Sequence, residues 1–120
     1  MNATDLIRYA DAWNDHNIDA IMAMMTDDCV FLTGGGTSNY GTRIEGFESV
    51  KKRFIEVWTD MHDAHFKNAH HFVDGDRGCS YWTFYGTNAD GIVTEVDGCD
   101  IFTFNGEKIK IKDSYIKIRR

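Results

Sequence analysis

The sequence contains no proline, only three cysteines and no long apolar run, and each of these shortages excludes something. Without proline, no ring interrupts the backbone hydrogen bonds of a helix or a strand. The cysteines at positions 29, 79 and 99 are odd in number and widely spaced, so they indicate neither a disulfide framework nor a thiolate zinc site. No stretch approaches the ~18 apolar residues of a membrane span, and the start of the chain does not look like a secretory signal. We therefore expect a cytoplasmic protein without membrane association.

Positive charge is also scarce, with 13 Lys and Arg against 19 Asp and Glu and a formal net charge of -6. Such a balance disfavours nucleic acid and anionic lipid surfaces as partners. The only basic cluster runs from Lys108 to Arg120, where lysine alternates with isoleucine. That alternation is typical of the solvent-facing side of a strand.

What the chain does contain is enough apolar material for one domain. Its 120 residues are 42% hydrophobic and 13% aromatic, which excludes disorder and predicts a single domain over residues 1–120. A chain of this length can bury one core and one modest pocket.

Hydrophobic periodicity predicts helices first and strands afterwards. The expected helices are Thr4 to Asn14, with Thr4 as the cap, Ile18 to Met25, and Phe47 to Trp58. A strand from Cys29 to Thr33 and a glycine-containing loop to Gly46 separate the second helix from the third. The later strands are Ala64 to Val73, Gly78 to Gly86, Gly91 to Phe104 and Lys108 to Arg119, joined by short turns. This order favours an α+β fold with an antiparallel meander, in which Asn105-Gly106 is the most secure turn.

Side chains alternate along a strand with a period of two, and this places two acids on apolar faces. Asp100 shares a face with Phe102 and Phe104, and Asp113 shares one with Ile109 and Ile111. A carboxyl buried away from cations can stay neutral and donate a hydrogen bond or a proton, whereas an ionised one nearby can act as a base. The alternative is that backbone, Tyr or Trp donors merely cap each acid.

A curved sheet covered by helices predicts one apolar pocket with a few polar groups inside. The side chains expected to line it are Trp13, Phe31, Trp58, His71, Trp82, Phe84, Phe102 and Tyr115. We interpret the tryptophans as core and pocket wall rather than a recognition stripe.

The histidines are candidate metal ligands. His62, Asp63 and His65 form a cluster with His70 and His71 nearby. They fall at a helix-to-strand junction where adjacent side chains diverge, and no third ligand follows from the spacing. We therefore predict no metal and no cofactor, and expect His71 or His65 to exchange a proton with an acid in the pocket.

Two segments carry a resemblance to a known family: Tyr9 to Val30, and Gly98 to Ile109 with Asp113 and Tyr115 beyond it. They resemble the opening and the last two strands of ketosteroid isomerase and of the wider nuclear transport factor 2-like (SnoaL-like) superfamily. The resemblance implies a cystatin-like cone, with three N-terminal helices packed on a curved antiparallel sheet around one pocket. It also implies a homodimer packed through the outer sheet face.

The resemblance carries over residue by residue only in part. Tyr9 and Asp100 match the tyrosine and the protonated aspartic acid that form the isomerase oxyanion hole, a mechanism taken from that enzyme and not worked out from this sequence. Thr33 stands where the isomerase has its catalytic base, and threonine cannot take that proton. Asp113 lies close to where SnoaL-like polyketide cyclases and limonene epoxide hydrolases have an acid on the closing strands.

These residues support two hypotheses about function. The first is a small cofactor-independent enzyme that transfers a proton on a hydrophobic carbonyl-bearing molecule, with Tyr9 and Asp100 binding the oxyanion and Asp113 moving the proton. The alternative is a non-catalytic small-molecule-binding or accessory domain with the same pocket, which the threonine at position 33 favours. A third, compatible possibility is an interaction module formed by the outer sheet face, where Cys99, Ile101 and Thr103 are expected.

Overall fold

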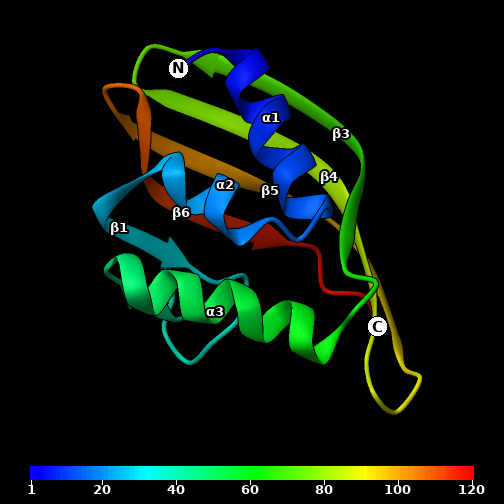
Figure 1. Cartoon of the computed structure of the whole chain (residues 1–120). Coiled ribbons are helices and arrows are strands. Elements are labelled where there is room, and N and C mark those ends of the chain that lie inside the picture. Colours follow the sequence, from blue (N-terminus) through cyan, green and yellow to red (C-terminus); the bar gives the residue numbers. More distant parts are fainter.

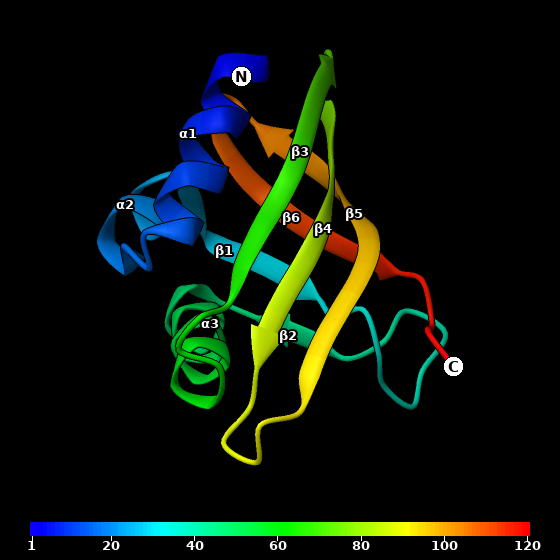
Figure 2. The same ribbon diagram turned by 90° about the vertical axis from the view of Figure 1, so that its right-hand side faces the viewer.

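A computed structural model describes all residues from 1 to 120. Three helices lie on one side of a single curved sheet (Figures 1 and 2). The helices are α1 (Ala3–Asn14), α2 (Ile18–Ala23) and α3 (Phe47–Asp60). The strands are β1 (Met25–Leu32), β2 (Arg43–Glu45), β3 (His65–Asp74), β4 (Arg77–Thr87), β5 (Val93–Asn105) and β6 (Lys108–Ile116). The predicted α+β architecture, with three helices packed on a curved sheet, is therefore confirmed.

The strands form one sheet in the order β2-β1-β6-β5-β4-β3. The predicted antiparallel meander is present from β3 to β6. The first strand departs from it, because β1 pairs with β6 in parallel and with the short β2 in antiparallel. None of the helices has the length and apolar character needed to cross a membrane.

Several element ends differ from the sequence prediction. The cap of α1 is Asn2 rather than Thr4, because the Asn2 side chain accepts from the Asp5 backbone N–H while the Asp5 carboxylate accepts from the Asn2 N–H. Strand β1 begins at Met25 and not at Cys29, since Met25 already pairs with Ile109 of β6.

A bulge in β6 decides which of its side chains face the helices. Thr103 pairs with Ile111 and the next residue of β5, Phe104, pairs with Ile109, so Lys110 is an extra residue on β6. One inserted residue reverses the inward and outward faces of everything beyond it. Ile109 and Lys112 are consequently both buried.

The prediction that Asp113 lies on the inner face is therefore wrong. Asp113 pairs with Ile101 on the outer face, where Ile101 is exposed. The expectation that the lysines of this strand face solvent is wrong at Lys112 for the same reason, because Lys112 pairs with the buried Phe102. Ser114 lies on the same face and pairs with the buried Asp100.

The core lies between the helices and the inner face of the sheet. Helix α1 contributes Leu6, Tyr9 and Trp13, and α3 contributes Val50 and Phe54, all buried. Full burial of one such apolar side chain stabilises the fold by about 1.5–3 kcal/mol. The amphipathic faces of the two helices thus hold them over the sheet and enclose a space between the helices and the sheet.

Candidate functional site

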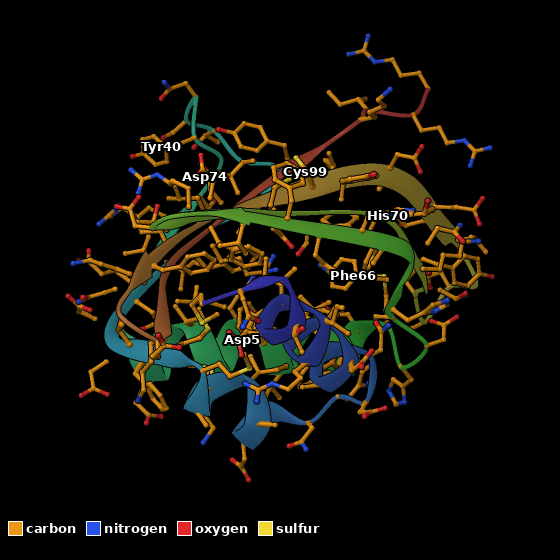
Figure 3. The ribbon with its side chains drawn as sticks, turned by 90° about the horizontal axis from the view of Figure 1, so that it is seen from above. Asp5, Tyr40, Phe66, His70, Asp74 and Cys99 are labelled. Atoms are coloured by element: carbon orange, nitrogen blue, oxygen red, sulfur yellow. The ribbon has the colours of Figure 1, made fainter.

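A cavity of about 370 Å³ lies between α1, α3 and the inner faces of β1 and β3 to β6. Its aromatic wall consists of Trp13, Phe31, Phe66, Trp82 and Phe84. The Phe66 ring lies 4.6 Å from that of Trp82 and 4.8 Å from that of Trp13, centroid to centroid. Figure 3 shows Phe66 on the side of the sheet that the helices cover. The Trp13 indole N–H is buried and has no hydrogen-bond acceptor.

The polar groups of the wall converge on one buried carboxylate. The Lys112 ammonium lies 2.7 Å from Asp100 Oδ2, and each of the two side chains is only 3% exposed. The same oxygen accepts from Trp82 Nε1 at 3.1 Å, and Oδ1 accepts from the Ser114 hydroxyl at 2.5 Å. Lys112, Trp82 and Ser114 all line the cavity, whereas Asp100 does not. The carboxylate is thus held behind the wall by three donors.

The Lys112 ammonium has bonding capacity left over. An ammonium carries three N–H donors, and the only acceptor within hydrogen-bond distance of this one is Asp100. Four aromatic rings surround it at 5.5–5.9 Å from their centroids, those of Tyr9, Phe31, Phe66 and Phe102. Such rings stabilise a cation but leave its N–H groups free to bind an oxygen atom.

A buried ion pair is an expensive way to hold a fold together. Removing two charges from water costs several kcal/mol per ion, and apolar residues of similar volume are often as stabilising. A charged pair in the wall of a cavity is therefore a candidate for function.

The structure separates the three residues expected to be catalytic. The Tyr9 hydroxyl points to Met25 Sδ at 3.7 Å and is not part of the cavity wall; burial, together with the charge of Asp100, holds the Tyr9 pKa well above its usual value. Asp113 accepts a hydrogen bond from Tyr115 at 3.2 Å on the outer face. Only Tyr9 and Asp100 lie near each other, with Lys112 in contact with both.

The residues expected to line the pocket divide into two groups. Trp13, Phe31, Trp82 and Phe84 line the cavity. Trp58, Phe102, His71 and Tyr115 do not line it.

The four residues outside the cavity wall have other contacts. Trp58 packs edge-on against Trp13 at 5.1 Å, and Phe102 lies beneath the Lys112 ammonium. His71 Nδ1 lies 2.7 Å from the Ser80 hydroxyl, and burial holds the His71 pKa below its ordinary value of 6.5.

Tyr115 belongs to the outer face of the sheet, since it is 56% exposed there. An open groove of about 480 Å³ on that face is lined by Tyr81, Cys99 and Tyr115, among others. Figure 3 shows Cys99 on the opposite side of the sheet from the helices. The homodimer expected through this face stays a prediction.

The remaining candidates have structural partners. Thr33 lines the cavity, but its hydroxyl donates to the Gly35 carbonyl at 2.7 Å and accepts from the Thr42 N–H at 2.9 Å. Asp63 accepts from the Thr87 N–H at 2.7 Å, which lowers the Asp63 pKa. Asp63 and the neighbouring histidines do not form a group of three ligands that could hold a metal ion.

Sequence reasoning missed three lining residues that matter chemically: Lys112, Phe66 and Arg53. The Lys-Ile alternation suggested a solvent-facing Lys112, and the bulge at Lys110 reverses that alternation. The signal for Phe66 in β3 was a single large apolar side chain between two polar residues, His65 and Lys67.

Gly98 makes room for the Trp82 ring beside the ion pair. A Cβ atom at Gly98 would collide with the backbone carbonyl oxygen of Tyr115 and would lie 2.8 Å from Trp82 Cη2, closer than such atoms approach. Gly98→Ala should therefore displace the indole and the neighbouring β6 backbone and lower the free energy of unfolding by about 1–3 kcal/mol, measured by urea denaturation. Gly35→Ala is the control, because nothing lies within 4 Å of its added Cβ. Equal stability of the two variants would contradict the prediction.

Comparison with known proteins places these observations in context. A family model described as the SnoaL-like domain matches residues 6–111. Among curated protein sequences, none matches the chain.

Three solved structures illustrate the likeness. A candidate polyketide cyclase from Pseudomonas putida KT2440 is 21% identical with a TM-score of 0.79, covering 98% of this chain and 93% of that one. A protein of unknown function with a cystatin-like fold, from Xanthomonas campestris, is 16% identical with a TM-score of 0.85, covering 98% and 92%. A protein with a ketosteroid isomerase-like fold from Catenulispora acidiphila DSM 44928, in complex with trimethylamine, is 16% identical with a TM-score of 0.79, covering 92% and 82%. At these identities the likeness establishes the fold.

Proposed function

The chain belongs to the SnoaL-like domain family, and we propose that it binds a hydrophobic small molecule in the cavity through an oxygen atom held by Lys112. The observation that carries the proposal is the buried ammonium in the aromatic wall, with Asp100 as its only hydrogen-bond acceptor. A carbonyl, enolate or phenolate oxygen would accept from its free N–H groups, while an apolar ring would pack against Phe66 and Trp82. Structures with this fold include a candidate polyketide cyclase and a complex with a small amine, so small-molecule binding suits the fold.

Binding is better supported than proton abstraction by a protein carboxylate. No aspartate or glutamate lines the cavity, and the Thr33 hydroxyl is engaged with its own loop. Asp100 is close, but its two oxygens accept hydrogen bonds from Lys112, Trp82 and Ser114. An acceptor held by three donors does not donate a hydrogen bond to an oxyanion.

A second candidate function is stabilisation of an enolate, in the manner of a cyclase or isomerase. The buried position of Lys112 favours it, because an ammonium shielded from water strongly stabilises charge that develops on a carbonyl oxygen. The proton would leave the adjacent carbon for water or for a basic group of the ligand, and Lys112 would hold the resulting oxyanion.

Acetophenone and isopropylbenzene, which share size and shape but differ in the carbonyl oxygen, test the proposal. We expect acetophenone to bind about five- to tenfold more tightly, the difference that one hydrogen bond to a charged donor makes. Quenching of tryptophan fluorescence reports binding, since Trp13 and Trp82 line the cavity. Equal affinities would contradict the role of Lys112. Deuterium exchange of the acetyl hydrogens, followed by NMR, tests the second candidate. If the exchange is no faster with the protein than in buffer, enolate stabilisation is wrong and only the binding proposal remains.

A further inference from the structure

The charge of the cavity lining is opposite to that of the protein. The chain carries a formal net charge of -6, yet the charged residues of the lining are Arg53 and Lys112, with no acid among them. Lys112 is neutralised from behind by Asp100. The charge left without a buried counterion is therefore that of Arg53.

Arg53 lies on α3, one turn before Val57, which also lines the cavity. Its side chain is 41% exposed, so it lies where the cavity opens to solvent. Its one ionic contact is Nη1 to the exposed Glu56 at 3.5 Å, at the limit of a hydrogen bond. A guanidinium has five N–H donors in a geometry that matches a carboxylate. Because Glu56 occupies at most one of them, most are available.

Two further donors in the cavity lining belong to the backbone. Gly34 and Gly35 line the cavity and are exposed, and neither N–H donates a hydrogen bond within the chain. Backbone N–H groups of successive residues are common partners of anions.

The buried part of the cavity wall, around Lys112, disfavours a cationic ligand. The aromatic rings that would attract an amine already surround the Lys112 ammonium. A second cation in the cavity would face the ammonium of the Lys112–Asp100 pair rather than its carboxylate, which lies behind the wall.

We infer that the ligand is a hydrophobic carboxylic acid, bound as its anion with the carboxylate on Arg53 at the mouth and a second oxygen on Lys112 at the buried end. This inference rests on the proposed function for the Lys112 end and adds the chemical class of the molecule. An aromatic acid with a carbonyl group opposite its carboxylate has the required order: anion, apolar ring, oxygen. A cavity of about 370 Å³ accommodates a single-ring acid of this kind.

Three compounds of one shape test the inference: 4-acetylbenzoate, its methyl ester and 4-acetylbenzylamine, titrated at pH 7 by calorimetry. They share the ring and the carbonyl and differ in the group at the other end, which is an anion, a neutral ester or a cation. We expect the acid to bind about five- to tenfold more tightly than the ester, with the amine weakest.

The variants Arg53→Gln and Lys52→Gln assign the effect to one side chain. Both remove one positive charge from α3, but Lys52 is exposed and does not line the cavity. We expect Arg53→Gln to bring the acid and the ester to equal affinity and Lys52→Gln to keep the difference.

The outcomes separate this inference from the proposed function. If the ester binds as well as the acid, or Arg53→Gln keeps their difference, the acid assignment is wrong while binding through Lys112 stands. If none of the three compounds binds, both are wrong for single-ring ligands.

Discussion

Lys112→Met is expected to lower the free energy of unfolding by about 3–5 kcal/mol, because it leaves the Asp100 carboxylate buried without its counterion. Methionine matches the lysine stem in length and apolar character, so the loss of charge dominates the change. The Asp100 side chain is 3% exposed, and relaxation toward solvent would have to open the sheet or the helix layer. Urea denaturation at pH 7, followed by circular dichroism, gives the free energy directly.

Lys110→Met is the matched control for this experiment. Lys110 lies two residues away on the same strand and pairs with Asp28 at 3.2 Å, but both side chains are exposed, by 41% and 66%. Surface pairs of this kind contribute at most about 1 kcal/mol. If Lys112→Met proves no more destabilising than Lys110→Met, the pair with Asp100 is not isolated from water as the structure describes.

The double variant Lys112→Met with Asp100→Asn is expected to recover most of the lost stability, to within about 1–2 kcal/mol of the wild type. It removes both charges and leaves an amide oxygen to accept from Trp82 or Ser114. At the same time it should abolish the preference for acetophenone over isopropylbenzene, because no ammonium remains to donate to the carbonyl. Relative to the Lys112→Met single variant, stability should therefore recover while the preference for the carbonyl stays absent.

This pair of results decides what the ion pair is for. Recovery of stability without recovery of oxygen binding means that the charges serve the ligand rather than the fold. A double variant that keeps the preference for the carbonyl would remove Lys112 from the binding site. A double variant that stays as unstable as the single one would mean that the damage lies in packing and not in charge.

The structure gives Asp100 a different role beside Tyr9 from the one that the resemblance to the isomerase implies. Asp100 was expected to be a neutral acid that donates to an oxyanion beside Tyr9. With Lys112 at 2.7 Å it is instead the acceptor for a cation, and the cation is the group that lines the cavity. In this chain the Lys112 ammonium lines the cavity, and Tyr9 and Asp100 do not.

Much of the site could be predicted from local patterns. Trp13 follows from the helical spacing of α1, and Trp82 and Phe84 follow from the aromatic density of β4, although periodicity alone did not decide between its faces. Asp100 was correctly placed on the inner face of β5 because the alternation along that strand is unbroken around it. Arg53 was not predicted, since the pattern of an amphipathic helix does not show which residue at the edge of its apolar face lines a cavity.

By itself the sequence determined the class of fold, the order of helices and strands and the meander from β3 to β6, because these depend on local periodicity and on turn residues such as Gly106, which has a φ of +63°. Only the tertiary structure decided that Lys112 is buried and that Asp113 is not. Ile109 and Ile111 fit either face equally well when β6 is considered alone. Pairing with β5 decides which face of the sheet each residue of β6 occupies, because the extra residue Lys110 reverses the direction of every side chain that follows.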